Sequence, residues 1–302
     1  MSANANSVKS VIYALSANLA IAVAKLGAAL VTGATSMMAE AVHSFADSGN
    51  QLLLLWGMRQ AHRPPTPDHP LGYGKAVYFW SFIVAIMLFS MGGLYSVYEG
   101  WHKLHAPETL STPWLAIGVL VFAIFAEGAS LMGCIREVNK ERGSRSFAQW
   151  FRETRTSELL VVFGEDLAAL LGLSFALLAL SLAMVTGNPA WDAAGSIAIG
   201  VLLIIVAVMV GVEVKALLIG QGMDPARKER MIRWLNDQPE VAHVFNLVSL
   251  QMGNDLMVAV KARMAPQPSD IALVEAINAV EARLQETFPA VMWSFFEPDI
   301  RD

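Results

Sequence analysis

The sequence contains little cysteine and little charge. Cys134 is the single cysteine in 302 residues, so one chain can build neither a disulfide framework nor a cysteine zinc cluster. Charged residues make up only 16% of the chain, against roughly 25% in soluble domains. The formal net charge is -5, and the sequence has neither a basic block nor basic residues interleaved with aromatic ones. These absences remove the electrostatic footprint of nucleic-acid binding, so nucleic acid is not an expected partner.

Hydrophobic residues dominate instead, at 55% of the chain. Because a helix needs about 20 apolar residues to cross a bilayer, the sequence predicts a polytopic α-helical protein with membrane lipid around it. The first apolar stretch is too long for a removable signal peptide and lacks a cleavage pattern. The six predicted transmembrane helices cover residues 9 to 32, 36 to 58, 78 to 101, 114 to 136, 158 to 186 and 191 to 219.

Lysine and arginine are divided very unequally between the connections. The N-terminus and the second and fourth connections together hold ten, whereas the alternate connections hold Lys103 alone. Because positive charge is retained on the cytoplasmic side, this asymmetry predicts that both termini are cytoplasmic. In a bacterium we expect the protein in the inner membrane.

The composition changes after Gly222, where a soluble segment begins. Asp224 followed by Pro225 is typical of a helix start, with the carboxylate as N-cap. Gly253-Asn254 is typical of a tight hairpin turn. The alternation of apolar and polar residues predicts the strands of this segment. After the helix that follows Asp224, the predicted elements are strands at 241–252 and 256–262, a helix at 270–287 and a strand at 291–296.

This helix-strand-strand-helix-strand module is a predicted cytoplasmic α+β dimerisation domain, residues 223–302, which follows a six-helix transport domain, residues 1–222. A lone sheet in a module of about 80 residues is marginally stable by itself. We therefore expect its apolar face to pack against a second copy in a homodimer.

Ionisable residues occur inside the predicted spans, where each one costs roughly 2.5 to 3.5 kcal/mol on insertion scales. His43 and Asp47 are four residues apart in the second span, so they share one helix face and can close on one divalent cation. A packing contact between neutral His43 and Asp47 is the alternative. Glu165 and Asp166 lie deep in the fifth span, with apolar residues on both sides.

These acids point to exchange of metal for protons. Asp47, Glu165 and Asp166 together would cost roughly 8 to 10 kcal/mol if they stayed charged without a partner. They must therefore bind protons or a cation. Because ligands lose protons to bind metal and regain them when it leaves, bound metal and bound protons exclude each other, which is the basis of a metal/proton antiporter.

Other polar residues of the spans have several interpretations. Asn18, Asn50 and Ser48 either donate hydrogen bonds to the metal ligands or make plain interhelical contacts. Glu127 in the fourth span is an extra ligand, a proton relay or a partner of Lys25 in the first span, and the sequence does not decide among these.

Two further features concern helix ends and helix packing. Asp192 opens the sixth span after Asn188-Pro189, where a solvated helix-start carboxylate is the simplest interpretation and a carboxylate that draws cations at the exit is the alternative. Small residues in the first and sixth spans, including Gly27, Gly195 and Gly200, predict close approach of neighbouring helices.

Three motifs resemble those of the cation diffusion facilitator family. They are Asn18 in the first span, the segment SMMAEAVHSFAD at 36–47 and the segment DHPLGYGK at 68–75. They occur in order, and the resemblance covers nearly the whole chain. The acidic pair followed by Ala168-Ala169 is similar to the branch that contains zinc transporter nine.

The resemblance implies a homodimeric exporter of divalent transition metals, commonly zinc, driven by proton exchange and without a prosthetic group. His43 and Asp47 match the ligand positions of the second span, and Asp166 matches the second ligand of the fifth span. The first ligand of the fifth span, usually His or Asp, falls on Val162.

Because one ligand is missing, the sequence does not fix which metal is transported. Glu165 or Glu127 can take the place of the ligand absent at Val162, and the sequence does not say which. A site with one nitrogen and two or three oxygens also suits manganese, cobalt or iron. Magnesium prefers oxygen ligands and keeps its waters, so His43 counts against it.

The soluble module also departs from the family pattern. Members often carry metal-binding histidines there, whereas Phe245, Val274 and Phe295 or Phe296 fall near those places here. We therefore expect no well-formed cytoplasmic metal site. In relatives a lysine that opens the third span bridges to an acid at the start of this domain, and Lys75 and Asp224 are the loose matches for that charge pair.

Two other functional classes compete with a transporter. An intramembrane metalloenzyme would need a third nitrogen ligand and a general base, and no His-Glu-x-x-His motif or equivalent is present. A metal sensor would need ligands in the soluble domain, where the family positions are lost. The sequence therefore favours a non-enzymatic exporter of divalent cations.

Overall fold

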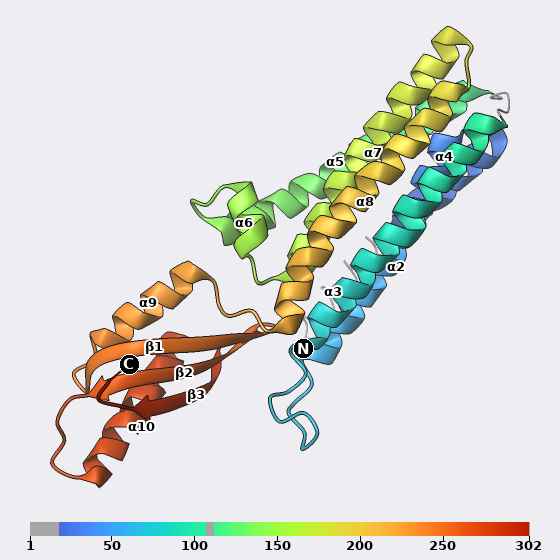
Figure 1. Ribbon diagram of the computed structural model, residues 1–302. Coiled ribbons are helices and arrows are strands. Elements are labelled where there is room, and N and C mark those ends of the chain that lie inside the picture. Colours follow the sequence, from blue (N-terminus) through green and yellow to red (C-terminus); the bar gives the residue numbers. More distant parts are fainter. Residues whose placement is uncertain (1–17, 107–111, 302) are drawn as a thin grey trace, which may run out of the picture. The chain divides into compact units, whose positions relative to one another are not determined.

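The computed structural model describes residues 18–106 and 112–301 of the chain (Figure 1). The predicted first span and Lys9 fall partly or wholly outside these residues, and the described part of that span is the helix Asn18–Thr32. The helices that follow are α2 (Thr35–Ala61), α3 (Ala76–Met87), the π-helix η1 (Leu88–Leu94), α4 (Tyr95–His105), α5 (Pro113–Arg142), α6 (Phe147–Glu153), α7 (Ser157–Thr186) and α8 (Ala190–Ile219).

Among the described residues, four continuous helices are long and apolar enough to cross a membrane. They are Ala76–His105, which runs through η1, and α5, α7 and α8. These helices confirm the prediction of a helical membrane protein with several spans. The predicted number of six is not shown, because the helix Asn18–Thr32 is short in its described part and the 27-residue α2 is interrupted by polar side chains.

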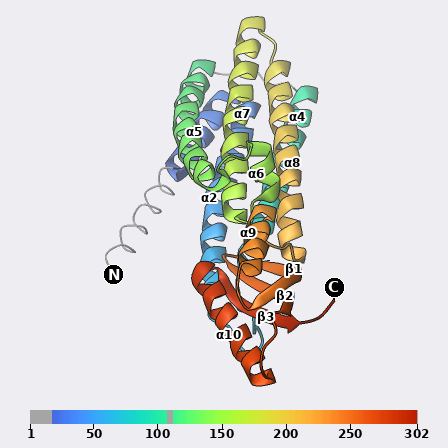
Figure 2. The same cartoon turned by 90° about the vertical axis from the view of Figure 1, so that its left-hand side faces the viewer.

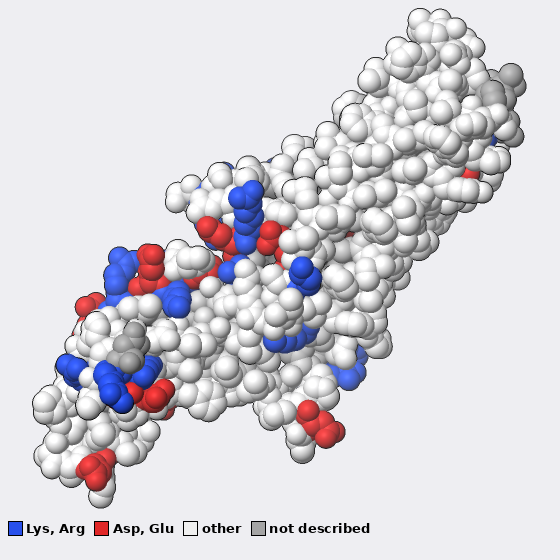
Figure 3. Space-filling model, in the orientation of Figure 1, with Lys and Arg blue, Asp and Glu red and all other residues white. Residues whose placement is uncertain are grey.

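The described chain forms two compact units. One contains the chain up to Gly57 together with Trp80–Ser144 and Glu158–Val212, and it is called the membrane unit below. The other contains Met58–Phe79, Arg145–Ser157 and the chain from Glu213 onward, and it is called the C-terminal unit. Figure 3 shows few charged side chains over the long helices of the membrane unit and many over the C-terminal unit.

Close packing of α8 confirms part of the prediction about small residues. A Cβ added at Gly200 would lie 2.7 Å from the Gly93 carbonyl oxygen and 2.7 Å from the Val97 backbone nitrogen, so only glycine allows this approach. Gly195 meets Ala179 of α7 in the same way, and α7 and α8 run side by side in Figures 1 and 2. In the first predicted span, a Cβ added at Gly27 meets no described atom within 4 Å, whereas the neighbouring small residues Ala28 and Ala29 are buried in the core.

Asp192 corrects another expectation. It is only 2% exposed, and its carboxylate accepts hydrogen bonds from the Thr35 backbone N–H at 2.5 Å, the Ser36 backbone N–H at 3.3 Å and the Ser36 hydroxyl. The prediction of a solvated carboxylate is therefore wrong. Because the first N–H groups of a helix lack partners within the helix, Asp192 of α8 caps the start of α2 instead.

The sheet of the C-terminal unit has the order β1-β2-β3. The antiparallel pair is β1 (Val241–Met252) with β2 (Asp255–Met264), and β3 (Val291–Pro298) pairs in parallel with β2. The helix α9 (Pro225–Asn236) precedes β1, and α10 (Asp270–Thr287) lies between β2 and β3. This order confirms the predicted helix-strand-strand-helix-strand module.

Local signals in the sequence account for these elements. Asp224 accepts a hydrogen bond from the Arg227 backbone N–H at 2.9 Å, as expected of an N-cap. Gly253 adopts φ of 70° in the hairpin turn, a conformation that favours glycine. In β2 the alternating apolar residues Leu256, Val258 and Val260 are fully buried or nearly so.

One face of the sheet has exposed apolar side chains. Val248 of β1 is registered with Ala259 of β2, and Ala259 is registered with Phe295 of β3, so the three share one row. Val248 and Phe295 are each 55% exposed. The sequence of α10 carries an apolar stripe of Ile271, Val274, Ile277, Val280 and Leu284. Val280 and Leu284 at its C-terminal end are buried, whereas Ile271 and Val274 are exposed.

Arg155 ties two segments of the C-terminal unit together. Its guanidinium donates to the Gly222 carbonyl oxygen at 2.7 Å and to the Glu153 carbonyl oxygen at 2.8 Å. Burial lowers the pKa of Arg155, and the negative charge of Asp224 partly offsets this effect. The same unit holds Tyr78, whose hydroxyl bonds to Gly253 in the hairpin turn.

Candidate metal site

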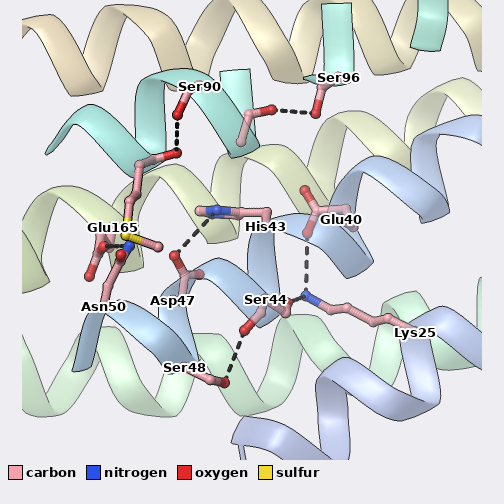
Figure 4. Close-up of polar contacts among 12 residues, drawn as sticks. Lys25, Glu40, His43, Ser44, Asp47, Ser48, Asn50, Ser90, Ser96 and Glu165 are labelled. Carbon is pink, nitrogen blue, oxygen red and sulfur yellow. Dashed lines mark hydrogen bonds and ion pairs between the residues drawn. The ribbon is translucent and has the colours of Figure 1, made fainter. Parts of the chain in front are cut away.

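One face of α2 carries the pair predicted from its four-residue spacing. His43 Nδ1 and Asp47 Oδ1 lie 3.3 Å apart, and the His43 side chain is fully buried (Figure 4). Neither ring nitrogen of His43 has a hydrogen-bond partner among the described residues, and Asp47 Oδ1 also lacks one. Buried polar atoms normally have hydrogen-bond partners, so these three atoms are suited to bind a metal ion or a proton.

A small polar cavity adjoins Asp47 inside the membrane unit. Its volume is about 20 Å³, which is room for one water molecule or one ion. It lies between the helix Asn18–Thr32, α2, α5 and α7. The residues that line it are Asn18, Ser44, Asp47, Gln51, Glu127, Val162, Glu165 and Asp166.

Neighbouring polar groups orient two of the cavity's carboxylates. The Asn50 amide of α2 donates to Glu165 Oε1 at 2.5 Å, and the Ser130 hydroxyl of α5 donates to Asp166 Oδ2 at 3.2 Å. Asn50 therefore holds a candidate ligand, which is one of the two roles considered for it. Because α2, α5 and α7 all contribute carboxyl groups, the cavity gathers four acidic side chains in an apolar region.

The predicted site residues are brought close together, but they do not yet form a coordination shell. Within the described part of the chain, no three side chains of His, Cys, Asp or Glu are arranged so that they could hold a metal ion. Asp47, Glu127, Glu165 and Asp166 share the cavity, whereas His43 contacts Asp47 from outside its lining. To coordinate one cation, these side chains would have to come closer together.

Val162 lies in the cavity wall, at the position where a ligand is expected from the family pattern. Glu127 and Glu165 line the same cavity, so each remains a candidate to replace the missing ligand.

The structure also contains site features that sequence reasoning missed. Gln51 lines the cavity, and Glu40 bonds to Lys25 at 3.3 Å. Lys25, considered as a partner of Glu127, is thus paired with Glu40. Glu40 lies three residues before His43, and this spacing along α2 was the available signal.

A π-helical segment lies against His43. In η1 a Cβ added at Gly92 would be 3.8 Å from His43 Nδ1 and 3.2 Å from Leu203 Cδ1. π-Helical turns are frequent at functional sites, and no signal in the sequence predicted this one.

The proposed charge pair in the C-terminal unit stays a prediction. Asp224 is engaged as the N-cap of α9, and Lys75 Nζ lies 4.0 Å from the position of a Cβ added at Gly220.

The sequence is similar to a described family and to several known proteins. The family described as "Cation efflux transmembrane domain" matches residues 11–219. "Proton-coupled zinc antiporter SLC30A9, mitochondrial" from Xenopus laevis is 35% identical over 231 residues, 76% of this chain and 41% of that protein. "Metal tolerance protein C4" from Arabidopsis thaliana is 32% identical over 252 residues, 82% of this chain and 55% of that protein. "Cation-efflux pump FieF" from Serratia proteamaculans is 25% identical over 262 residues, 85% of this chain and 81% of that protein.

The extent of these matches decides what they establish. The chain spans only 41% of the Xenopus relative, so that protein's activity as a whole does not transfer. The family match, in contrast, covers more than half of the chain and includes every residue that lines the cavity. The chain therefore belongs to the cation efflux family of multi-pass membrane transporters and not to a class of enzymes.

Proposed function

We propose that the protein is a secondary active exporter that moves divalent transition metals, with zinc as the favoured ion, out of the cytoplasm by metal/proton antiport. The observation that carries the proposal is the cavity in which Asp47, Glu127, Glu165 and Asp166 gather inside the membrane unit. His43, whose ring nitrogens have no hydrogen-bond partner among the described residues, adds a nitrogen ligand one helical turn from Asp47. This set of oxygen and nitrogen ligands suits a divalent transition metal.

Charge explains why metal and protons would exchange. Several ionised carboxylates in one apolar cavity repel one another and have lost their hydration, so they must bind a cation or become protonated. A dication expels the protons when it binds, and protons displace the dication when they return. The two states alternate, and a proton gradient then drives metal in the opposite direction.

The architecture we propose has six transmembrane helices in residues 1–222 and a cytoplasmic α+β domain in residues 223–302, with both termini cytoplasmic. Two copies form a homodimer through the C-terminal domain. The exposed side chains of Val248 and Phe295, which lie in one row on one face of the sheet, support this dimer, because exposed apolar patches often mark interaction sites.

Flux in proteoliposomes tests the function. With the full chain reconstituted, we expect an imposed proton gradient to drive Zn²⁺ against the proton flow. We also expect metal affinity to fall as pH falls, by about tenfold per pH unit for each proton displaced. Isothermal titration between pH 6 and pH 8 measures the second effect. Metal binding without flux would instead identify a sensor. A metal affinity that does not change with pH would contradict proton coupling.

His43 is expected to set the metal preference. Replacing it by aspartate changes a nitrogen ligand to oxygen, so the preference for Zn²⁺ over Mn²⁺ should fall by roughly tenfold. Competition between the two ions in reconstituted vesicles measures the ratio. An unchanged order of preference would mean that His43 does not touch the transported ion.

A further inference from the structure

A buried ion pair lies beside the cavity, and the proposed exchange of metal for protons does not use it. Lys25 of the helix Asn18–Thr32 and Glu40 of α2 are both fully buried, with Lys25 Nζ 3.3 Å from Glu40 Oε2. Figure 4 shows the lysine reaching α2 between Glu40 and Ser44. Lys25 is the one lysine or arginine that is buried in residues 18–106 and 112–301.

The geometry places the lysine charge at the cavity wall. Lys25 Nζ donates to the Ser44 hydroxyl at 2.7 Å, and Ser44 lines the cavity together with Asp47 and Glu127. The ammonium is therefore separated from the cavity by a single hydroxyl group. In a region of low dielectric, a fixed charge at this range acts strongly on any cation in the cavity.

Glu40 only partly cancels that charge. Its bond to Lys25 is longer than the usual 2.7 to 2.9 Å of a charge-assisted pair. Its second oxygen, Oε1, has no hydrogen-bond partner in the described part of the chain and lies against Gly172 of α7, where a Cβ would take its space. A buried pair of this kind adds little stability compared with apolar side chains, so a role in stability alone does not explain it.

We propose that Lys25 is a fixed countercharge that weakens the binding of the transported dication enough for it to leave, and that Glu40 moderates this effect. A transport site must bind its ion tightly enough to admit it and weakly enough to release it. Without Lys25, the carboxylates of the cavity would hold a dication more tightly. Without the Glu40 charge, the lysine would repel the dication more strongly. Both residues are positioning residues, and the inference rests on the proposed function.

The test is the sign of the change in Zn²⁺ affinity of the purified full chain. Lys25→Met should bind Zn²⁺ at least about tenfold more tightly and turn over more slowly, with KM and kcat both lowered. Glu40→Gln should bind at least about tenfold more weakly. The double variant removes both charges, leaves no unpaired buried ion and should return toward the affinity of the parent.

Matched controls separate charge from packing. Lys25→Arg keeps the charge and should stay near the parent, as should Lys215→Met, which removes an exposed lysine of α8. If Lys25→Met fails to fold, Lys25→Gln keeps hydrogen-bonding capacity and gives the same sign. If the Zn²⁺ affinities of Lys25→Met and Glu40→Gln shift in the same direction, or if neither shifts, the proposed countercharge role is overturned. The proposed transport function would still stand. A parent chain that binds no Zn²⁺ would overturn both proposals.

Discussion

Asp47→Asn should abolish proton-driven zinc flux, with transport at least roughly 100-fold below that of the parent chain. The substitution keeps the size of the side chain and removes one negative charge from the cavity, where Asp47 lies 3.3 Å from His43. It thereby removes both a ligand for the dication and a site that must release a proton when metal binds. Zn²⁺ uptake into proteoliposomes under an imposed proton gradient measures the loss.

A matched control distinguishes loss of the site from loss of negative charge in general. Glu137→Gln removes an acid from α5 that is exposed and pairs with Lys140 on the surface, and exposed pairs contribute little. This variant should keep parental flux. If both Asp47→Asn and Glu137→Gln transport Zn²⁺ at the parental rate, the cavity is not the transport site.

Gly200→Ala should have the largest effect on stability. The new methyl group would lie 2.7 Å from the Gly93 carbonyl oxygen and from the Val97 backbone nitrogen, and backbone cannot rotate away. Overpacking of this kind typically costs about 1 to 3 kcal/mol. We expect the midpoint of thermal unfolding in detergent to fall by roughly 5 °C, together with reduced flux because α8 is pushed from the helix that carries η1.

Glycines of α5 provide the control for this variant. Gly118 and Gly133 face open space, where an added Cβ meets no described atom within 4 Å. Alanine also has the higher helix propensity, so Gly118→Ala and Gly133→Ala should leave the midpoint unchanged or slightly raised. A midpoint for Gly200→Ala that matches these two variants would show that α8 tolerates a wider separation.

Much of the fold could be predicted because its signals are local. The α+β module followed from an N-cap at Asp224, a glycine turn at Gly253 and strict alternation along β2, each of which acts within a few residues. The pairing of His43 with Asp47 followed from helix periodicity alone. The buried half of α10 was less predictable, because the sheet rather than the helix decides how far the apolar stripe is covered.

The sequence by itself determined that this is a membrane protein of the cation efflux family and which intramembrane residues are candidates for the site. Only the tertiary structure decided that Lys25 pairs with Glu40, that Asp192 caps α2 and that Val162 lies in the cavity wall. The physical reason is that composition and periodicity act within one helix. The partner of a buried charge depends instead on which faces of distant helices meet.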